Sequence, residues 1–350
     1  MKTQSAKTIA ILQLLGVEKP FIQAPMAGAD TPDMALSTAR AGGLGSLACA
    51  MLTPAQIVDA FAYIRQHTDK PINLNFFCHK QADKSAEQQA RWKIRLAGYY
   101  KEFGVDPDNI APSTARAPFD ETFCKVAEDL RPGVISFHFG LPHETLLRRV
   151  KDAGNIVLSS ATTAEEAVWL EQHGCDIIIA QGSEAGGHRG MFLTQDLSAQ
   201  KNTVDLLPQI IAAVSVPVVA AGGLADKQSI NGALSLGAAA VQVGTAFLFC
   251  PEARVAPLHR GMLQTDHSTV LTNVFSGRPA RGISNRFIQD AGPISPDAPD
   301  FPYASDLVAP LRQASERAGR VDFMQMWSGD VRKPHQMNAQ ELTAFLCEDL

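Results

Sequence analysis

The sequence predicts an α/β protein that folds as a (β/α)8 (TIM) barrel with an elaborated cap, and two observations lead to this fold class. Short apolar runs recur along the first 250 residues, separated by segments of helical character. Nearly every run ends in Gly, Pro, Asn, Gln, Ser or His, as buried parallel strands do at the edge of a sheet. A doubly wound open sheet shows the same alternation, but continuous apolar strands of this number favour a closed barrel. The eight expected strands are residues 21–26, 43–50, 72–77, 134–140, 156–161, 175–182, 216–223 and 239–247.

The segments between these runs carry helix signals. TPAQIVDAFAYIRQH begins with Thr53 as a plausible cap and Pro54 in the first turn. TTAEEAVWLEQHG combines alanine and glutamate with a terminal glycine, Gly174. Helices of this kind would form the outer layer of the barrel.

Two segments exceed what a bare barrel requires. Residues 79–131 are rich in charge and too long for one connection, so we expect extra helices after the third strand. Residues 248–350 contain Gly, Pro and Asp clusters and predict a helical segment with loops over one barrel mouth. We therefore expect a barrel over residues 1–250, with its insertion at about 79–131, and a cap over residues 251–350, all within one compact unit.

The composition favours a protein that acts on a small molecule. The 350 residues are 45% hydrophobic, with a formal net charge of −5 and no dense basic run, so neither nucleic acid nor an anionic membrane surface is an expected partner. The six cysteines lack CxxC pairing, and we expect neither a metal site nor a disulfide framework. The apolar stretch IAILQLLGV is too short to span a membrane and lacks a signal-peptide cleavage region, so we expect a cytoplasmic protein. The oligomeric state stays open.

The last two strands predict a phosphate site. Gly222 and Gly223 follow the seventh strand, and Gly244 and Thr245 end the eighth. Barrels of this class place their active sites at the C-terminal strand ends and commonly hold phosphate there. Glycine lets backbone N–H groups approach phosphate oxygens, and Thr245 adds a hydroxyl donor. A tight turn would explain one glycine pair, but two pairs on these consecutive strands favour phosphate.

The remaining strand ends suit a flat ring with a polar edge. The small residues of PMAG (25–28) could lie against its face, while the amides of Asn75 and Gln181 could reach its edge. Flavin mononucleotide (FMN) has this shape together with a phosphate. The stretch CDIIIAQGSEAGGHRG then delivers Gln181, two glycines that allow a close backbone approach, and His188. The alternative for this stretch is a strand-to-helix turn with a surface histidine.

Four motifs resemble the nitronate monooxygenases, FMN-dependent (β/α)8 barrels formerly called 2-nitropropane dioxygenases. They are QAPMAG (23–28), AQGSEAGGHRG (180–190), VPVVAAGGLAD (216–226) and AVQVGTAFL (240–248). Parts of them also resemble flavin-dependent enoyl reductases and NADH:quinone reductases. VISFHFGLP (134–142) distinguishes these families, because it is similar to the FHFG segment of the class I monooxygenases.

The resemblance implies that His138 of FHFG is the catalytic residue beside the flavin N5, with Phe137 and Phe139 on the opposite face. It also places His188 on the substrate side. Neutral imidazole, with an ordinary pKa near 6.5, can remove a proton next to a nitro group at neutral pH. Protonated imidazole, or a hydrogen bond from the ring, can instead position the oxygens of a nitronate that arrives as an anion. The sequence leaves both roles open.

The resemblance further implies oxidation of alkyl nitronates, such as propionate 3-nitronate, by O2 through a flavin semiquinone, giving an aldehyde or oxo acid plus nitrite. Tyr303 is the expected further substrate residue, and Arg312 is a possible one. WSGD (327–330) stands where relatives have WAGQ, and an anionic Asp330 beside a flavin is unfavourable unless paired. The expected FMN-binding residues are Pro25, Met26, Ala27, Asn75, Gln181, Gly186, Gly187, Gly222, Gly223, Gln242, Val243, Gly244 and Thr245.

Two other functions remain open from the sequence. The first is an FMN-dependent NAD(P)H reductase of an enoyl thioester or a quinone, which could use the same cradle. No GxGxxG fingerprint follows a strand, but such reductases bind the nicotinamide without one. The second is a protein that binds a flavin or phosphorylated metabolite without turnover, because fold alone does not imply catalysis.

Overall fold

Eight parallel strands form the barrel in the computed structural model, which describes residues 5–110, 117–348 and 350. Their order around the barrel is β1, β9, β8, β6, β5, β4, β3, β2. A parallel bridge between Ile22 and Leu44 joins the two outer strands and brings the sheet close to closure. The predicted barrel and all eight of its strands are confirmed. The strands are β1 Phe21–Gln23, β2 Gly45–Ala48, β3 Ile72–Phe77, β4 Gly133–His138, β5 Ile156–Ala161, β6 Ile177–Gln181, β8 Val218–Ala221 and β9 Ala240–Val243.

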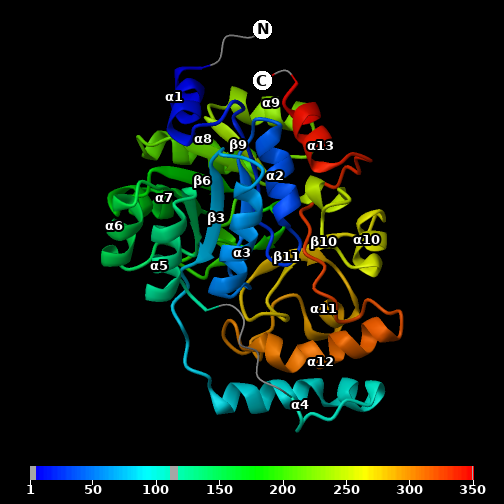
Figure 1. Ribbon diagram of the computed structural model, residues 1–350. Helices are drawn as coiled ribbons and strands as arrows, with labels where there is room; N and C mark the ends of the chain where they lie inside the picture. Colours follow the sequence, from blue (N-terminus) through cyan, green and yellow to red (C-terminus); the bar gives the residue numbers. More distant parts are fainter. Residues whose placement is uncertain (1–4, 111–116, 349) are drawn as a thin grey trace.

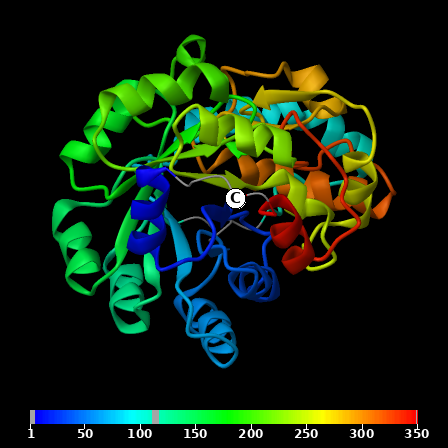
Figure 2. The same ribbon diagram turned by 90° about the horizontal axis from the view of Figure 1, so that it is seen from above.

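Helices surround the strands as an outer layer (Figures 1 and 2). Helix α3 begins as expected: Thr53 caps it, Pro54 occupies the first turn, and Gln56 completes a capping box. In α7 the capping residue is Thr163. The helices of this layer are α2 Pro32–Arg40, α3 Pro54–Arg65, α5 Glu121–Leu130, α6 Glu144–Asp152, α7 Ala164–Gln172, α8 Thr203–Ala213, α9 Lys227–Ser235 and α13 Ala339–Leu346.

The barrel interior is apolar at one end and polar at the other. Helix α1, Ala6–Leu15, brings Ile11 and Leu15 into a buried cluster with the inward-facing residues Ile22 and Leu44. This helix corresponds to the apolar N-terminal stretch, and no helix in the described chain could cross a membrane. At the opposite end, the strands finish in polar side chains, and this is the end at which enzymes with this fold place their active sites. These side chains include Asn75, Ser136, Ser160, Gln181 and Gln242.

A cap covers the polar end of the barrel. The insertion after β3 contributes α4, Ala86–Phe103, while α5 from the same segment belongs to the barrel layer. Helix α4 packs on α12, Ala304–Arg317, and Figure 1 shows both helices beyond the barrel. Trp92 and Leu96 of α4 share a buried cluster with Leu311 of α12. The cap also contains η1 Leu197–Ala199, η2 Thr245–Phe249, α10 Pro257–Leu263, α11 Arg286–Ala291 and the antiparallel strands β10 Thr269–Thr272, β11 Ala280–Ile283 and β7 Gly187–His188.

The final helix does not follow the expected division at residue 250. Helix α13 packs against α2, and its Leu342 and Leu346 join the core between strands and outer helices. Figure 1 shows α13 toward the same end of the molecule as α1, far from α12. The C-terminal segment therefore supplies both the cap and a helix of the barrel layer, because the apolar face of α2 needs a covering helix.

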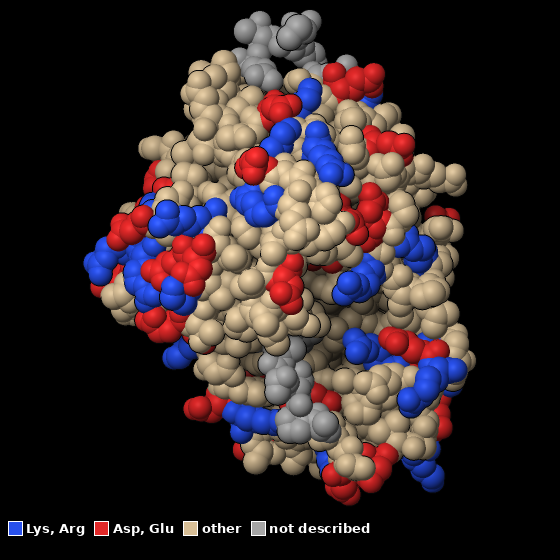
Figure 3. All heavy atoms as spheres, in the orientation of Figure 1, with Lys and Arg blue, Asp and Glu red and all other residues tan. Residues whose placement is uncertain are grey.

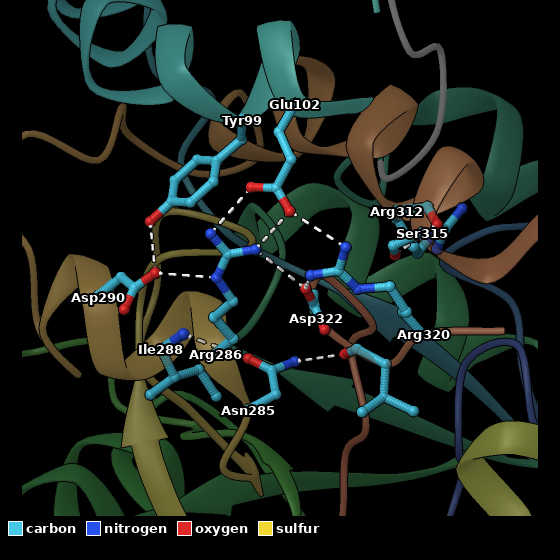
Figure 4. A network of polar contacts seen from close by, with 11 residues as sticks. Tyr99, Glu102, Asn285, Arg286, Ile288, Asp290, Arg312, Ser315, Arg320 and Asp322 are labelled. Carbon is cyan, nitrogen blue, oxygen red and sulfur yellow. Dashed lines mark hydrogen bonds and ion pairs between the residues drawn. The ribbon is translucent and has the colours of Figure 1, made fainter. Parts of the chain in front are cut away.

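A polar network attaches α4 to the rest of the cap (Figure 4). The Arg286 guanidinium donates to both carboxylate oxygens of Glu102 on α4, at 2.8 and 2.9 Å. It also contacts Asp322 at 3.3 Å, and the Tyr99 hydroxyl donates to Asp290 at 2.9 Å. Single exposed ion pairs contribute little, but a bidentate pair within a network fixes an orientation. On the face shown in Figure 3, basic and acidic side chains are interspersed.

Candidate active site

A cavity of about 480 Å³ lies where the strand ends meet the cap. The β1–α2 loop forms one wall, the glycine loops after β6, β8 and β9 form another, and the segment around Trp327 forms a third. Most residues expected at the site therefore come together. The expected residues that line it are Pro25, Met26, Ala27, Gly28, Asn75, His138, Gln181, Gly186, Gly187, His188, Gly222, Gly223, Gln242, Gly244, Thr245 and Arg312.

His138 ends β4 and is held on both sides. Its Nε2 lies 3.1 Å from the carbonyl oxygen of His188, and its Nδ1 lies 3.1 Å from the Ser160 hydroxyl. Burial lowers the pKa of His138 to about 4, although the hydrogen bond to that carbonyl opposes this shift. The ring is therefore neutral at pH 7. A carbonyl can only accept, so Nε2 carries the proton and Nδ1 accepts from Ser160.

The two phenylalanines beside His138 do not share one face, so that expectation is wrong. Phe137 is buried in the outer core, with its ring 5.1 Å from that of Phe119. Phe139 adopts a φ of 70°, which ends the alternation of the strand. Its ring centroid lies 4.5 Å from that of His138, within an aromatic cluster that includes Phe77 and Phe301. His138 thus borders an apolar wall.

His188 and Gln181 are tied to the same local network. The His188 carbonyl accepts a second hydrogen bond, from Gln181 Nε2 at 3.0 Å, while Gln181 Oε1 accepts from the Gly190 amide at 2.7 Å. The His188 ring contacts the Ser276 hydroxyl at 2.8 Å. The Gln181 amide therefore orients the loop that carries His188, rather than being free toward a ligand.

The glycine loops form a cradle that side chains would fill. Gly222 has a φ of 111°, and a Cβ there would lie 3.0 Å from Thr203 Oγ1. A Cβ on Gly186 would lie 2.5 Å from the amide nitrogen of Gly329. Within the described chain, the amides of Gly222 and Gly223 donate no hydrogen bond. These N–H groups can bind oxygen atoms of an anion.

Two amide side chains differ in what they offer a ligand. Asn75 Nδ2 donates to the Ser136 hydroxyl oxygen at 2.9 Å and to its carbonyl at 3.2 Å. Gln242 Oε1 is buried and has no hydrogen-bond partner among the described residues. A buried acceptor without a partner is costly unless a ligand or water donates to it. Gln242 is thus the strand-end amide best placed to accept from a bound ring.

Comparison with known proteins identifies the family. The family model for nitronate monooxygenase matches residues 9–349. The nitronate monooxygenase of Pseudomonas aeruginosa is 39% identical over 346 residues, covering 97% of this chain and 98% of the relative. The chain belongs to the nitronate monooxygenase family.

Solved structures agree with this family assignment. A nitroalkane oxidase from Streptomyces ansochromogenes is 34% identical, has a TM-score of 0.86 and covers 97% of each chain. FabK from Thermotoga maritima has a TM-score of 0.72 at 24% identity, covering 97% of this chain and 94% of the other. At that identity the likeness to FabK shows the shared fold alone.

Three residues that the sequence analysis considered for the site of this nitronate monooxygenase lie outside the cavity lining. Val243 is fully buried in the outer core. The Tyr303 hydroxyl accepts from Gln81 Nε2 at 2.7 Å and donates to the Ala82 carbonyl at 3.1 Å, which attaches α12 to the insertion. Asp330 forms an ion pair with Arg281 at 2.8 Å. This ion pair compensates the negative charge of Asp330, which would be unfavourable beside a flavin if it were unpaired.

The cavity also includes residues that sequence reasoning missed. Ser160 stands next to the end of a predicted strand, and Ser136 lies two residues before His138 on the same face of β4, so the strand-end rule and the alternation of the strand could have found them. Gly190, inside a recognised motif, does not line the cavity but packs against His138, because a Cβ there would lie 3.0 Å from His138 Cε1. Arg254 and His259 follow the last strand in a segment without a motif, and no signal pointed to them.

Proposed function

We propose that this protein oxidises nitronates with O2 using FMN, releasing nitrite and an aldehyde or oxo acid. The observation that carries the proposal is a neutral, doubly held His138 in one cavity with an open glycine cradle. Membership of the family agrees with it, as does the name of the relative from Pseudomonas aeruginosa.

The residues present fit FMN. The free amides of Gly222 and Gly223 would hold the phosphate, and the unpartnered Gln242 Oε1 would accept a hydrogen bond from the ring. Pro25 and Met26 would lie against the ring, because their loop lines the cavity. When bound, FMN would supply the electron transfer between the nitronate and O2.

His138 is better arranged to position an anion than to remove a proton. Its Nδ1 lone pair accepts from Ser160, so taking a proton from carbon would require that bond to break. Its Nε2–H could instead donate to a nitronate oxygen alongside the His188 carbonyl, which leaves the tautomer and the bond to Ser160 unchanged. We infer that preformed nitronates are better substrates than neutral nitroalkanes. The aromatic wall of Phe77, Phe139 and Phe301 would exclude water from the reacting groups.

The deciding experiment is oxygen uptake by the purified protein loaded with FMN. Ethyl nitronate is added without NAD(P)H, and nitrite is measured alongside oxygen. Oxygen uptake with nitrite release supports the proposal. In a second assay, NADH or NADPH is added anaerobically without nitronate, and flavin absorbance is followed.

The two assays separate the alternatives. Bleaching of the flavin by a reduced nicotinamide, with no nitronate-dependent uptake, would make the protein a reductase. Flavin binding without either response would leave a binding protein. Failure to bind FMN would overturn every flavin-dependent function. Comparison of ethyl nitronate with nitroethane at equal concentration tests the inferred preference for the preformed anion.

A further inference from the structure

A short segment, residues 276–279, packs against the loop that carries His188. It precedes β11, and its Ser276 hydroxyl lies 2.8 Å from Nε2 of His188. Gly277 has a φ of 89°, and a Cβ there would lie 2.1 Å from a carbonyl oxygen of the cap. The backbone of this segment is therefore closely packed on both sides. It carries Arg278, to which the proposed chemistry assigns no role.

The guanidinium of Arg278 lies over the ring of Phe139. Its central carbon is 4.2 Å from the ring centroid, which is the distance of a cation–π contact. The centroid of the same ring lies 4.5 Å from that of His138. Phe139 is thus in contact with both the guanidinium and the imidazole, and it connects the two.

The charge of Arg278 has little local compensation. Its guanidinium makes one hydrogen bond, to the Met191 carbonyl at 3.3 Å, and no ion pair with any described carboxylate. Burial lowers the pKa of Arg278, although the group stays protonated at neutral pH. A partly buried guanidinium without a carboxylate partner costs stability. Methionine would cover Phe139 without that cost, so the charge itself points to a function.

Glu166, the carboxylate that acts on Arg278 at longer range, is occupied by other donors. One of its oxygens accepts from the amide and the hydroxyl of Thr162, both at 2.7 Å. The other accepts from the amides of Phe192 at 2.6 Å and Leu193 at 3.2 Å. Glu166 therefore holds the loop after β7 and opposes the charge of Arg278 only from a distance.

The surroundings of His138 contain one further buried positive charge. Arg189 is buried, and its guanidinium donates to the carbonyls of Gln181 and Gly182, both at 2.6 Å. Burial lowers the pKa of His138 most, and the charges of Arg278 and Arg189 lower it further. A change at Arg189 would break several hydrogen bonds of the loop, whereas a change at Arg278 breaks one. The charged and titratable side chains that surround His138 among the described residues are His79 after β3, His188 on β7, Arg189 after it and Arg278 before β11.

We propose that Arg278 is a positioning residue that acts on His138 through Phe139, holding this ring against the imidazole and placing a positive charge behind it. A nearby positive charge disfavours the imidazolium, so the imidazole keeps Nε2–H as a donor and Nδ1 as an acceptor for Ser160. The inference rests on the proposed nitronate oxidation, because it assigns control of the histidine used in that reaction.

The first test measures the protonation of His138 without turnover. Ring nitrogen shifts of the histidines are recorded by NMR at pH 7 and pH 5 on the FMN-loaded protein, and His138→Gln identifies the signal. Arg278→Met keeps the length of the side chain but removes the charge, so the pKa of His138 should rise by about half a unit or more. The protonated fraction at pH 5 should then increase by about two- to threefold. Arg278→Lys keeps the charge and should stay close to the wild type.

Arg65→Met is the matched control. Arg65 also lies over a phenylalanine ring, 4.6 Å from the centroid of Phe61, but on an outer helix away from the cavity lining. This variant should leave the protonated fraction of His138 unchanged. Melting temperatures show how much each change disturbs the fold, and Arg278→Gln replaces the methionine variant if that one does not fold. An equal protonated fraction in the wild type and the uncharged variant would overturn the proposal.

The second test asks whether this control matters for turnover. Both kcat and KM for ethyl nitronate are measured at pH 7.5 in the same variants. Arg278→Met should lower kcat/KM by about tenfold, and Arg278→Lys should recover most of that loss. Equal losses in the two variants would show that the charge has no part in turnover, which contradicts the proposal. If the wild type oxidises no nitronate, the proposed function fails, while the protonation of His138 still decides whether Arg278 acts on this ring.

Discussion

The backbone carbonyl of His188 accepts a hydrogen bond from the side chain of His138 at 3.1 Å. This contact joins the end of β4 to the loop after β6, two segments that are fifty residues apart. It also sets the tautomer of His138, because the carbonyl requires a proton on Nε2. The reactive orientation of one histidine therefore depends on the backbone of the other.

Replacing His138 with asparagine should remove most turnover while leaving FMN bound. The change keeps polarity and size but removes the imidazole, so we expect kcat to fall by about a hundredfold or more. FMN content by absorbance and the melting temperature check cofactor binding and fold. His143→Asn, at the exposed start of α6, is the control and should keep full activity. Full activity in His138→Asn would contradict the role given to this ring.

The lowered pKa of His138 predicts an acid-sensitive contribution to stability. The unfolded state binds this proton near pH 6.5 and the folded state only near pH 4, so stability falls as pH drops across that interval. From pH 7.5 to pH 5 the loss from one such histidine is about 2 kcal/mol. Urea unfolding at the two pH values, in the wild type and His138→Gln, measures the difference. A loss of equal size in both proteins would refute the assignment.

Gly222→Ala should weaken FMN binding while leaving the rest of the fold intact. The new Cβ would meet Thr203 Oγ1 at 3.0 Å and impose a side chain on a φ of 111°. We expect at least a tenfold rise in the Kd for FMN, measured by fluorescence quenching. Gly154→Ala has a similar φ of 87° but open space around its Cβ, so it controls for backbone strain. The same Kd in both variants would remove Gly222 from the cradle.

Asp30 should be necessary for the shape of the 24–29 loop. Its carboxylate accepts from the Met26 amide at 2.7 Å and the Ala48 amide at 3.0 Å, and burial raises its pKa to about 7. Asp30→Ala leaves two amides unpaired and should cost about 2 kcal/mol or more, with weaker FMN binding. Asp30→Asn keeps an acceptor and should recover much of both losses. Equal behaviour of the two variants would show that the hydrogen bonds do not matter.

The sequence predicted the barrel well because its strands are locally encoded. The expected runs 72–77 and 156–161 match β3 and β5 at both ends, since a strand buried on both faces reads as a continuous apolar run. The active site of this fold lies at the C-terminal strand ends. The sequence alone could therefore place His138, Asn75 and the glycine pairs together at that end of the barrel.

What escaped prediction depends on tertiary contacts. The side on which Phe139 lies follows from one positive φ, which no pattern of alternation announces. The hydrogen bonds of Gln181 are set by the fold of the Gly190 loop, Arg254 enters the lining from the segment before α10, and His259 enters it from α10 itself. Tyr303 carries the right chemistry, yet its hydroxyl is used to attach α12.

The pairing of α13 with α2, and of β1 with β9, has a consequence during synthesis. The first strand of the barrel pairs with β9, which begins at Ala240, and its first outer helix packs on α13 at the end of the chain, although both elements also contact β2. As the polypeptide leaves the ribosome, part of the apolar surface of β1 stays uncovered until β9 is made, and part of that of α2 stays uncovered until α13 is made. A barrel closed by such long-range pairing folds slowly, and its exposed hydrophobic surface is prone to aggregation until folding is complete. The nascent chain therefore exposes apolar surface of its first elements for much of its synthesis.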